Sequence, residues 1–239
     1  MKTTVHAESK GPSLTDRMKA YEQAYTYNLT KRTPIIIRLD GKAFRTWTTN
    51  LNRPFDPILP ELMQETVKYL MKEIQGCAFA FSQSDEISLF LRDYDTLTTE
   101  SWFGSSLQKI VSVSASLATA KFNQAAAKHN LPLAHFDARA FILPKEEVVN
   151  YFIYRQHDGL RNSVSMYANH NLGHKAIQNK NVNDMKAMLQ EKGTPWESVP
   201  TVFRHGFAIR KDESQITTEL PLFKDDRSYI EELVYVKPE

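Results

Sequence analysis

The stretch IIIRLDG at residues 35–41 decides the fold, together with CAFAFSQSDEISLFL at residues 77–91. The first stretch is apolar and largely β-branched as far as Leu39 and is followed by Asp40 and Gly41, which is typical of a buried strand that ends in a turn. The second stretch contains two apolar runs on either side of an acidic turn, which predicts a hairpin. Three strands with acids at their ends are therefore expected.

The predicted order of elements is β-α-β-β-α-β, which is the ferredoxin-like pattern. Right-handed crossovers in this pattern place the first and third strands at the centre of the sheet. We expect an α+β fold with a ferredoxin-like polymerase palm over residues 14–143 and a mainly helical region over 144–239 that packs on it. The predicted helices are 14–29, 58–75, 100–129, 145–157, 162–178 and 182–192, and the predicted strands are 35–40, 77–83, 87–92 and 136–143, with strand-like runs at 199–210 and 230–236.

This topology brings three carboxylates together: Asp40 at the end of one central strand, and Asp85 and Glu86 at the start of the other. Burying acids at strand ends is unfavourable unless something pairs with them. Mg²⁺ prefers oxygen ligands and is commonly held by one or two acids and substrate phosphates. The three acids therefore predict a phosphoryl-transfer site with two metal ions.

Cationic side chains lie near the first acid. The sequence has no Walker-type glycine loop, no zinc spacing of cysteines and no Gly-x-Ser-x-Gly motif. A nucleoside triphosphate would therefore be held by cations and backbone amides. Lys42, Arg45 and Arg53 are candidates for phosphate contacts, with solvated surface cations as the alternative for each, and Lys109 is a further candidate on a helix of small residues.

Charge is unevenly distributed, although the net charge is only +2. Residues 151–211 carry nine Lys or Arg and four Asp or Glu, whereas residues 212–239 carry three and eight. A basic segment of this size can supply contacts to the phosphates of a nucleic acid, for which Arg155, Arg161 and Lys175 are candidates. An ordinary basic surface is the alternative.

The cysteine content and the apolar runs of the sequence indicate the cellular compartment. Cys77 is the single cysteine, which excludes an intramolecular disulfide and fits a reducing environment. No apolar run approaches the roughly 20 residues that span a bilayer, and residues 1–12 are polar, unlike a secretory signal. We expect a cytoplasmic protein with no membrane partner.

Several motifs resemble those of the tRNA-His guanylyltransferase family. The resemblance rests first on RLDGKAF at residues 38–44, RPFD at 53–56 and SQSDEIS at 82–88. It extends over most of the chain and includes the Trp102-Phe103 pair before Lys109, the Arg155-Gln156 pair, RNSVSMY at 161–167 and Arg204-His205-Gly206.

The resemblance implies addition of nucleotides to the 5′ end of tRNA, in the direction opposite to ordinary polymerases. A 5′-monophosphate is activated by ATP or GTP, and the 3′-hydroxyl of an incoming GTP then displaces the activating nucleotide. By matching of residues, Asp40, Asp85 and Glu86 hold two Mg²⁺ ions with the carbonyl of Gly41. The resemblance also implies a homotetramer built as a dimer of dimers. Nucleotide contacts fall on Arg38, Gly41, Lys42, Ala43, Phe44, Arg45, Arg53, Asp56, Ser84 and Lys109, and tRNA contacts on Arg155, Arg161, Asn162, Lys175 and Arg204.

One segment departs from the eukaryotic members that add an extra guanosine to tRNA-His. Those members carry His-Ile-Asn-Asn-Leu-Tyr-Asn after the Arg-Gln pair, whereas residues 160–166 read LRNSVSM here. Arg161 and Asn162 resemble instead the bacterial and archaeal "like" proteins, which favour template-dependent repair of truncated tRNA 5′ ends. We therefore expect template-dependent 3′–5′ addition, with dedicated guanosine addition to tRNA-His as the alternative. A nucleotidyl cyclase and a non-catalytic RNA-binding module are more remote alternatives.

Overall fold

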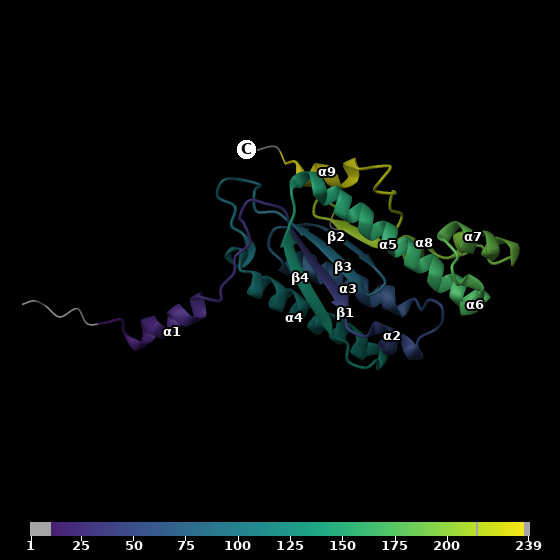
Figure 1. Ribbon diagram of the computed structural model, residues 1–239, viewed down its shortest axis with the longest axis horizontal. Coiled ribbons are helices and arrows are strands. Elements are labelled where there is room, and N and C mark those ends of the chain that lie inside the picture. The colour runs from purple at the N-terminus through teal and green to yellow at the C-terminus, as the bar shows by residue number, and fades with distance from the viewer. Residues whose placement is uncertain (1–10, 214, 237–239) are drawn as a thin grey trace, which may run out of the picture.

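The computed structural model describes residues 11–213 and 215–236, so most of the predicted polar N-terminus, residues 1–10, lies outside the described residues. One six-stranded antiparallel sheet forms the centre of the molecule, in the order β4-β1-β3-β2-β5-β6 (Figure 1). The strands are β1 (Ile35–Gly41), β2 (Cys77–Gln83), β3 (Glu86–Leu91), β4 (Phe136–Ile142), β5 (Phe207–Arg210) and β6 (Ile216–Thr217).

The first four strands have the ferredoxin-like arrangement that the sequence predicts. β1 and β3 pair at its centre, in register from Ile35 opposite Leu91 to Asp40 opposite Glu86. The expected α+β class is therefore confirmed.

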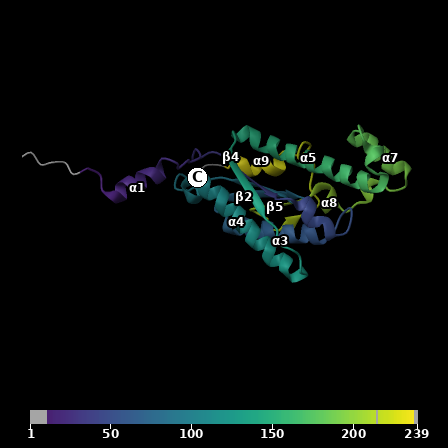
Figure 2. The ribbon, with the colours of Figure 1, turned by 60° about the horizontal axis from the view of Figure 1, so that its bottom comes forward.

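Helices cover both faces of the sheet (Figure 2). α3 (Ile58–Glu73) and α4 (Leu107–Ala126) pack on one face, and α5 (Lys145–Leu172) with α9 (Ser228–Val234) packs on the other. Successive strand residues point to opposite faces, so Ile35 and Ile37 belong to the first core and Ile36 to the second. The remaining α-helices are α1 (Leu14–Gln23), α2 (Phe44–Trp47), α6 (His174–Ile177), α7 (Val182–Glu191) and α8 (Thr201–His205), and short 3₁₀ helices occupy Thr48–Asn50, Trp102–Ser105, Ala127–His129 and Trp196–Ser198.

Two predictions for the C-terminal region were wrong, and a third, the strand-like run at 199–210, was right only for β5, because residues 201–205 form α8. The helices expected at 145–157 and 162–178 are mostly one helix, α5, which continues through Gly159 because this residue packs against Gln83, where a Cβ would meet the amide oxygen at 3.0 Å. The strand expected at 230–236 is α9, which buries residues at helical spacing, namely Ile230, Leu233 and Val234.

The C-terminal region contributes to the same sheet as the palm, because β5 pairs with β2 from Phe79 opposite Arg210 to Ser82 opposite Phe207. A third hydrophobic cluster joins α5 to α7 through Val164, Leu189 and Trp196. Among the described residues, no helix combines the length and the apolar character that crossing a membrane requires.

Candidate active site

The end of β1 meets the turn between β2 and β3. The hairpin turn consists of Ser84, which has a positive φ of 57°, and Asp85. The Gly41 amide donates to the Asp85 carbonyl at 3.1 Å, and Asp40 is the register partner of Glu86. The structure therefore brings the three predicted acids to one end of the sheet.

Glu86 is held by two arginines on the face of the sheet that α5 covers. Its Oε1 accepts from Arg155 Nε at 2.5 Å, its Oε2 accepts from Arg155 Nη2 at 2.5 Å, and Arg38 also donates to Oε2. Both carboxylate oxygens are thus used within the protein. This arrangement fastens β1, β3 and α5 together through Glu86.

Asp40 and Asp85 differ from Glu86, because neither carboxylate forms an ion pair with a Lys, Arg or His of the described chain. The pKa of Asp85 is raised to about 6, mainly by burial and to a smaller extent by the charges of Asp40 and Glu86, against hydrogen bonds such as that from Ser84. Two adjacent uncompensated carboxylates fit a divalent cation. Within residues 11–213 and 215–236, no group of three or more His, Cys, Asp or Glu has a metal-binding arrangement, so substrate oxygens or backbone carbonyls would have to complete the shell.

Two cavities meet at the hairpin turn. The larger has a volume of about 730 Å³ and lies between α2, the loop before α3, α5 and α8. The smaller, of about 230 Å³, lies beneath α5 and is lined by Arg38, Asp40, Glu86 and Arg155. Residues that line both cavities are Gln83, Ser84, Asp85 and Met166.

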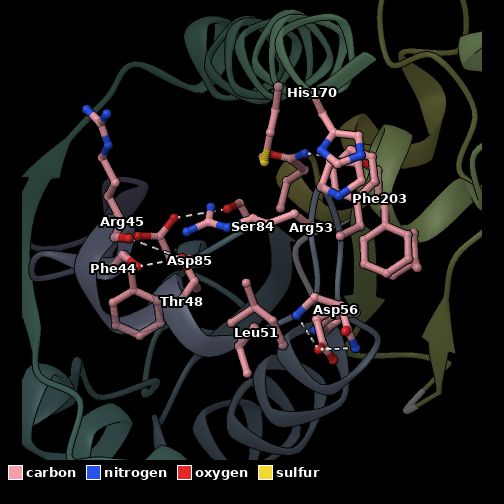
Figure 3. Close-up of a pocket in the computed structure, with 18 of the residues that line it drawn as sticks. Phe44, Arg45, Thr48, Leu51, Arg53, Asp56, Ser84, Asp85, His170 and Phe203 are labelled. Carbon is pink, nitrogen blue, oxygen red and sulfur yellow. Dashed lines mark hydrogen bonds between the residues drawn. The ribbon is translucent and has the colours of Figure 1, made fainter. Parts of the chain in front are cut away.

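The larger cavity has a cationic side and an aromatic side (Figure 3). Arg45 and Arg53, which the sequence analysis names as candidate nucleotide contacts, line this cavity together with Asp85. Phe44 forms part of its wall, and a Cβ at Gly41 would overlap the Phe44 ring, which explains the glycine at this position. Phe203 lies opposite (Figure 3).

Three other predicted nucleotide contacts either hold the loop at the edge of the cavity or lie outside both cavities. Asp56 borders the larger cavity, but its carboxylate accepts hydrogen bonds from the backbone and side chain of Asn52 and from the amide of Ile58, so it holds the loop before α3. Lys42 and Ala43 are exposed and line neither cavity.

Lys109 lies at the opposite end of the sheet from Asp40. It is in the first turn of α4, where the Leu107 amide donates to Tyr27 in the segment that leads into β1. Since β1 spans seven residues at about 3.3 Å each, roughly 20 Å separates the two ends. The side chain lines neither cavity, so the geometry of a single chain does not support Lys109 as a contact to a nucleotide near Asp85.

The five predicted tRNA contacts divide into two groups. Arg155 is 5% exposed and bonded to Glu86 and Asp158, and Arg204 donates to the Val199 carbonyl at 2.7 Å and lies over Trp196. Both guanidinium groups therefore have partners within the folded chain. The remaining candidates are exposed on α5 and α6: Arg161, Asn162 and Lys175.

Sequence reasoning missed the aromatic side of the larger cavity. Phe55 stacks between Phe203, at 4.9 Å, and Tyr167, at 6.1 Å. His170 also borders this cavity. These residues come from three distant segments without a common motif, so no signal in the sequence joined them.

Comparisons with known proteins agree with this geometry. Residues 15–144 match the family described as tRNAHis guanylyltransferase (Thg1). A bacterial tRNA(HIS) guanylyltransferase (Thg1)-like protein in complex with ATP is 46% identical, with a TM-score of 0.91 over 94% of this chain and 100% of that chain. Another such bacterial structure, in complex with GTP, is 42% identical, with a TM-score of 0.82 over the same shares of the chains. The tRNA(His) guanylyltransferase of Schizosaccharomyces pombe is 31% identical over 59% of this chain and 54% of its own length.

The family match covers more than half of the chain, from residue 15 to residue 144 of 239. It includes the end of β1 and the acidic hairpin turn. This protein is therefore a member of the tRNA-His guanylyltransferase family, and as such a nucleotidyltransferase.

Proposed function

We propose that this protein adds nucleotides in the 3′ to 5′ direction to the 5′ end of tRNA, choosing each by pairing with the opposite strand. The observation that carries the proposal is the position of Asp40 and Asp85, two acids that form no ion pair with any Lys, Arg or His of the described residues, where two cavities meet. The larger cavity, of about 730 Å³, is within the size range of small-molecule sites. A reaction that joins a nucleotide to an RNA end needs two adjoining binding places of this kind.

The proposed substrates are ATP, GTP and a tRNA with an incomplete 5′ end. In the first step, an oxygen of the tRNA 5′-phosphate attacks the α-phosphorus of ATP or GTP, and pyrophosphate leaves. In the second step, the 3′-hydroxyl of the incoming nucleotide attacks the 5′-phosphorus, and the activating nucleotide leaves as its monophosphate. The relatives in complex with ATP and with GTP support this choice of nucleotides.

The acids have different parts in this proposal. Asp40 and Asp85 would hold two Mg²⁺ ions, with the Gly41 carbonyl as a further ligand. When bound, Mg²⁺ neutralises charge on the phosphoryl oxygens. Glu86 is a positioning residue, because its ion pairs with Arg38 and Arg155 fix the start of β3 against α5 and thereby orient the turn that carries Asp85.

The larger cavity would bind the activating nucleotide. Phe203 offers apolar surface to a base, while Arg45 and Arg53 line the same cavity as Asp85, where they can neutralise phosphate charge. The exposed cations Arg161 and Lys175 would contact the tRNA backbone, and such contacts weaken as salt rises. The proposal includes the homotetramer that the family resemblance implies.

A panel of truncated tRNAs tests the proposal. We would supply a tRNA that lacks its first nucleotide and carries a 5′-monophosphate, with each of the four bases in turn at the opposing position. A paired nucleotide stacked on the stem end orients its 3′-hydroxyl for attack, so kcat/KM should be highest for G opposite C, C opposite G and U opposite A. The matched control is a tRNA with a 5′-triphosphate, which already has pyrophosphate as a leaving group and should not need ATP.

The alternative is dedicated addition of guanosine to tRNA-His, which the fission yeast relative's name describes. It predicts guanosine addition at equal kcat/KM opposite every base, and only on tRNA-His. That result would reject template-dependent repair. Release of a cyclic nucleotide without any change in the tRNA would reject nucleotide addition as a whole.

A further inference from the structure

The smaller cavity cannot enclose a whole nucleotide. Its volume is about 230 Å³, whereas sites that enclose a small ligand have roughly 300–1,000 Å³. In the proposed function the activating nucleotide occupies the larger cavity, so the incoming nucleotide must reach Asp40 from the smaller one. Its ribose, which carries the attacking 3′-hydroxyl, can enter this cavity, and its base must then lie outside, on the surface around the opening.

The surface around this opening lies between β4 and α5. The two elements start close together and diverge toward the end of the sheet that carries Asp40 (Figures 1 and 2). Where they are close, Tyr151 of α5 covers Phe141 of β4, with ring centroids 5.6 Å apart. Arg139 and Asp137 point to the same face of β4 as Phe141, but both are exposed, and Asp137 is the register partner of Asp40. The face of the sheet is therefore uncovered beside the acids.

Tyr154 borders this uncovered surface. It comes three residues after Tyr151 and four before Asp158, which lines the smaller cavity, so the three side chains follow one side of α5. Tyr154 is 56% exposed and is the only large apolar or aromatic side chain among the described residues that is exposed on a helix covering the sheet. Single exposed aromatic residues are ordinary on protein surfaces. What distinguishes Tyr154 is its place beside the cavity that holds Asp40.

The ring of Tyr154 is held from one side. The guanidinium carbon of Arg155 lies 4.9 Å from the centre of the ring, and Arg155 is fixed in turn by two hydrogen bonds to Glu86. A cation over one face of an aromatic ring is attracted to it, and the exposed remainder of the ring faces solvent. A ring that is fixed behind and open in front is the kind of surface on which proteins stack the unpaired bases of RNA.

We propose that Tyr154 stacks on the base of the incoming nucleotide while that base pairs with the template strand of the acceptor stem. The new base pair is then held between the last pair of the stem and the Tyr154 ring. The inference rests on the proposed function and names a residue that selects the nucleotide. A Watson–Crick pair presents a flat surface to the ring, whereas a mispaired base is displaced from that plane, so stacking favours the paired nucleotide.

Two exposed arginines near the ring can hold the stem. Arg161 follows Tyr154 by two turns of α5, roughly 10 Å along the helix, and Arg139 is on β4. Arg139 forms no ion pair with an Asp or Glu of the part of the chain that the structure describes. Contacts from these side chains to phosphates would orient the stem without reading its sequence. The choice of nucleotide is then left to pairing and to stacking on Tyr154.

Tyr154→Ala and Tyr154→Phe test the stacking. The substrate is a truncated tRNA with a 5′-triphosphate, which accepts a nucleotide without activation. Tyr154→Ala should lower kcat/KM for the paired nucleotide about 10–100-fold and should lower the ratio of kcat/KM between paired and unpaired nucleotides. Tyr154→Phe keeps the ring and should resemble the wild type. Tyr235→Ala is the matched control, because Tyr235 is 49% exposed and lies beyond the far end of β3, where the neighbouring Val234 contacts Tyr94.

A truncated tRNA with a 5′-monophosphate separates stacking from support of Arg155. Activation by ATP precedes the incoming nucleotide, so Tyr154→Ala should transfer labelled AMP to the 5′ end at the rate of the wild type. If Tyr154 acts only by bracing Arg155 and Glu86, activation and stability in urea would fall together with nucleotide addition, which would overturn the inference.

Two other results would also overturn it. One is an unchanged kcat/KM and an unchanged ratio in Tyr154→Ala, and the other is an equal loss in Tyr154→Phe, which would assign the effect to the hydroxyl group. A wild type that adds no nucleotide, or adds guanosine equally opposite every base, would reject the proposed function and this inference with it. That failure is visible in the wild type, before any variant is compared.

Discussion

Replacing Asp85 by Asn should stabilise the fold while abolishing nucleotide addition. The carboxylate is buried beside Asp40 and Glu86, so its pKa rises from the ordinary 3.8 to about 6. At about 1.4 kcal/mol for each pKa unit, ionised Asp85 opposes folding at pH 7.5 by up to ~3 kcal/mol. The uncharged amide of Asn removes this opposition.

The sign of the pH dependence follows from the same rise. Between pH 3.8 and 6, the folded protein binds more protons at Asp85 than the unfolded chain does, so wild-type stability falls as the pH increases through this window. Above pH 6 this loss of stability is complete, and at pH 5 the loss is about half of its full value. The stability gained by Asp85→Asn should therefore be largest at pH 7.5 and about half as large at pH 5.

Urea unfolding in the presence of a chelator measures these differences. Asp158→Asn is the matched control, because Asp158 lines the same small cavity but is ion-paired with Arg155 and Arg161. The control should gain no stability and should lose up to about 1 kcal/mol, since Arg155 and Arg161 each lose an ion pair. Added Mg²⁺ should stabilise the wild type and leave Asp85→Asn unchanged. If Asp85→Asn is less stable than the wild type at pH 7.5 without metal, the carboxylate is compensated and our reasoning about the site is refuted.

Three further predictions follow from the contacts. Arg155→Met leaves Glu86 with one cationic partner, so we expect a loss of about 3 kcal/mol in urea unfolding, and an unchanged midpoint would contradict the positioning role of this pair. Charge reversal at Arg161 or Lys175 should weaken tRNA binding and flatten its dependence on salt, while the affinity for GTP, measured by calorimetry, stays constant. Equal losses of tRNA affinity and GTP affinity would assign these cations to the nucleotide site. Gly206→Ala should destabilise the protein by several kcal/mol, because the residue has a φ of 76° and a Cβ would meet the backbone of β2. A melting temperature equal to that of the wild type would contradict this prediction and show that the turn relaxes.

Local patterns and topology predicted most of the palm. The run at residues 35–41 has the length and composition of a central strand, and the order of elements alone places Asp40 beside the turn that carries Asp85. The prediction failed where local propensity and packing disagree. Gly159 reads as a helix break, but its lack of a side chain is what allows α5 to pass Gln83.

The roles of individual side chains were harder to predict than their positions. Glu86 and Arg155 are 69 residues apart, and only the packing of α5 on the sheet makes them partners. Asp56 reads as a nucleotide ligand by its motif, but the loop around it takes up its hydrogen-bonding capacity. Such contacts depend on the geometry of the folded chain, which no spacing in the sequence encodes.

The residues that both cavities have in common restrict how the enzyme can be redesigned. Changing Ser84 or Met166 to admit a different nucleotide would reshape the neighbouring cavity at the same time. Thr48, Leu51 and Phe203 border only the larger cavity. On the proposed assignment of the larger cavity to the nucleotide, base preference can be altered at these three positions while the contacts around Glu86 stay intact.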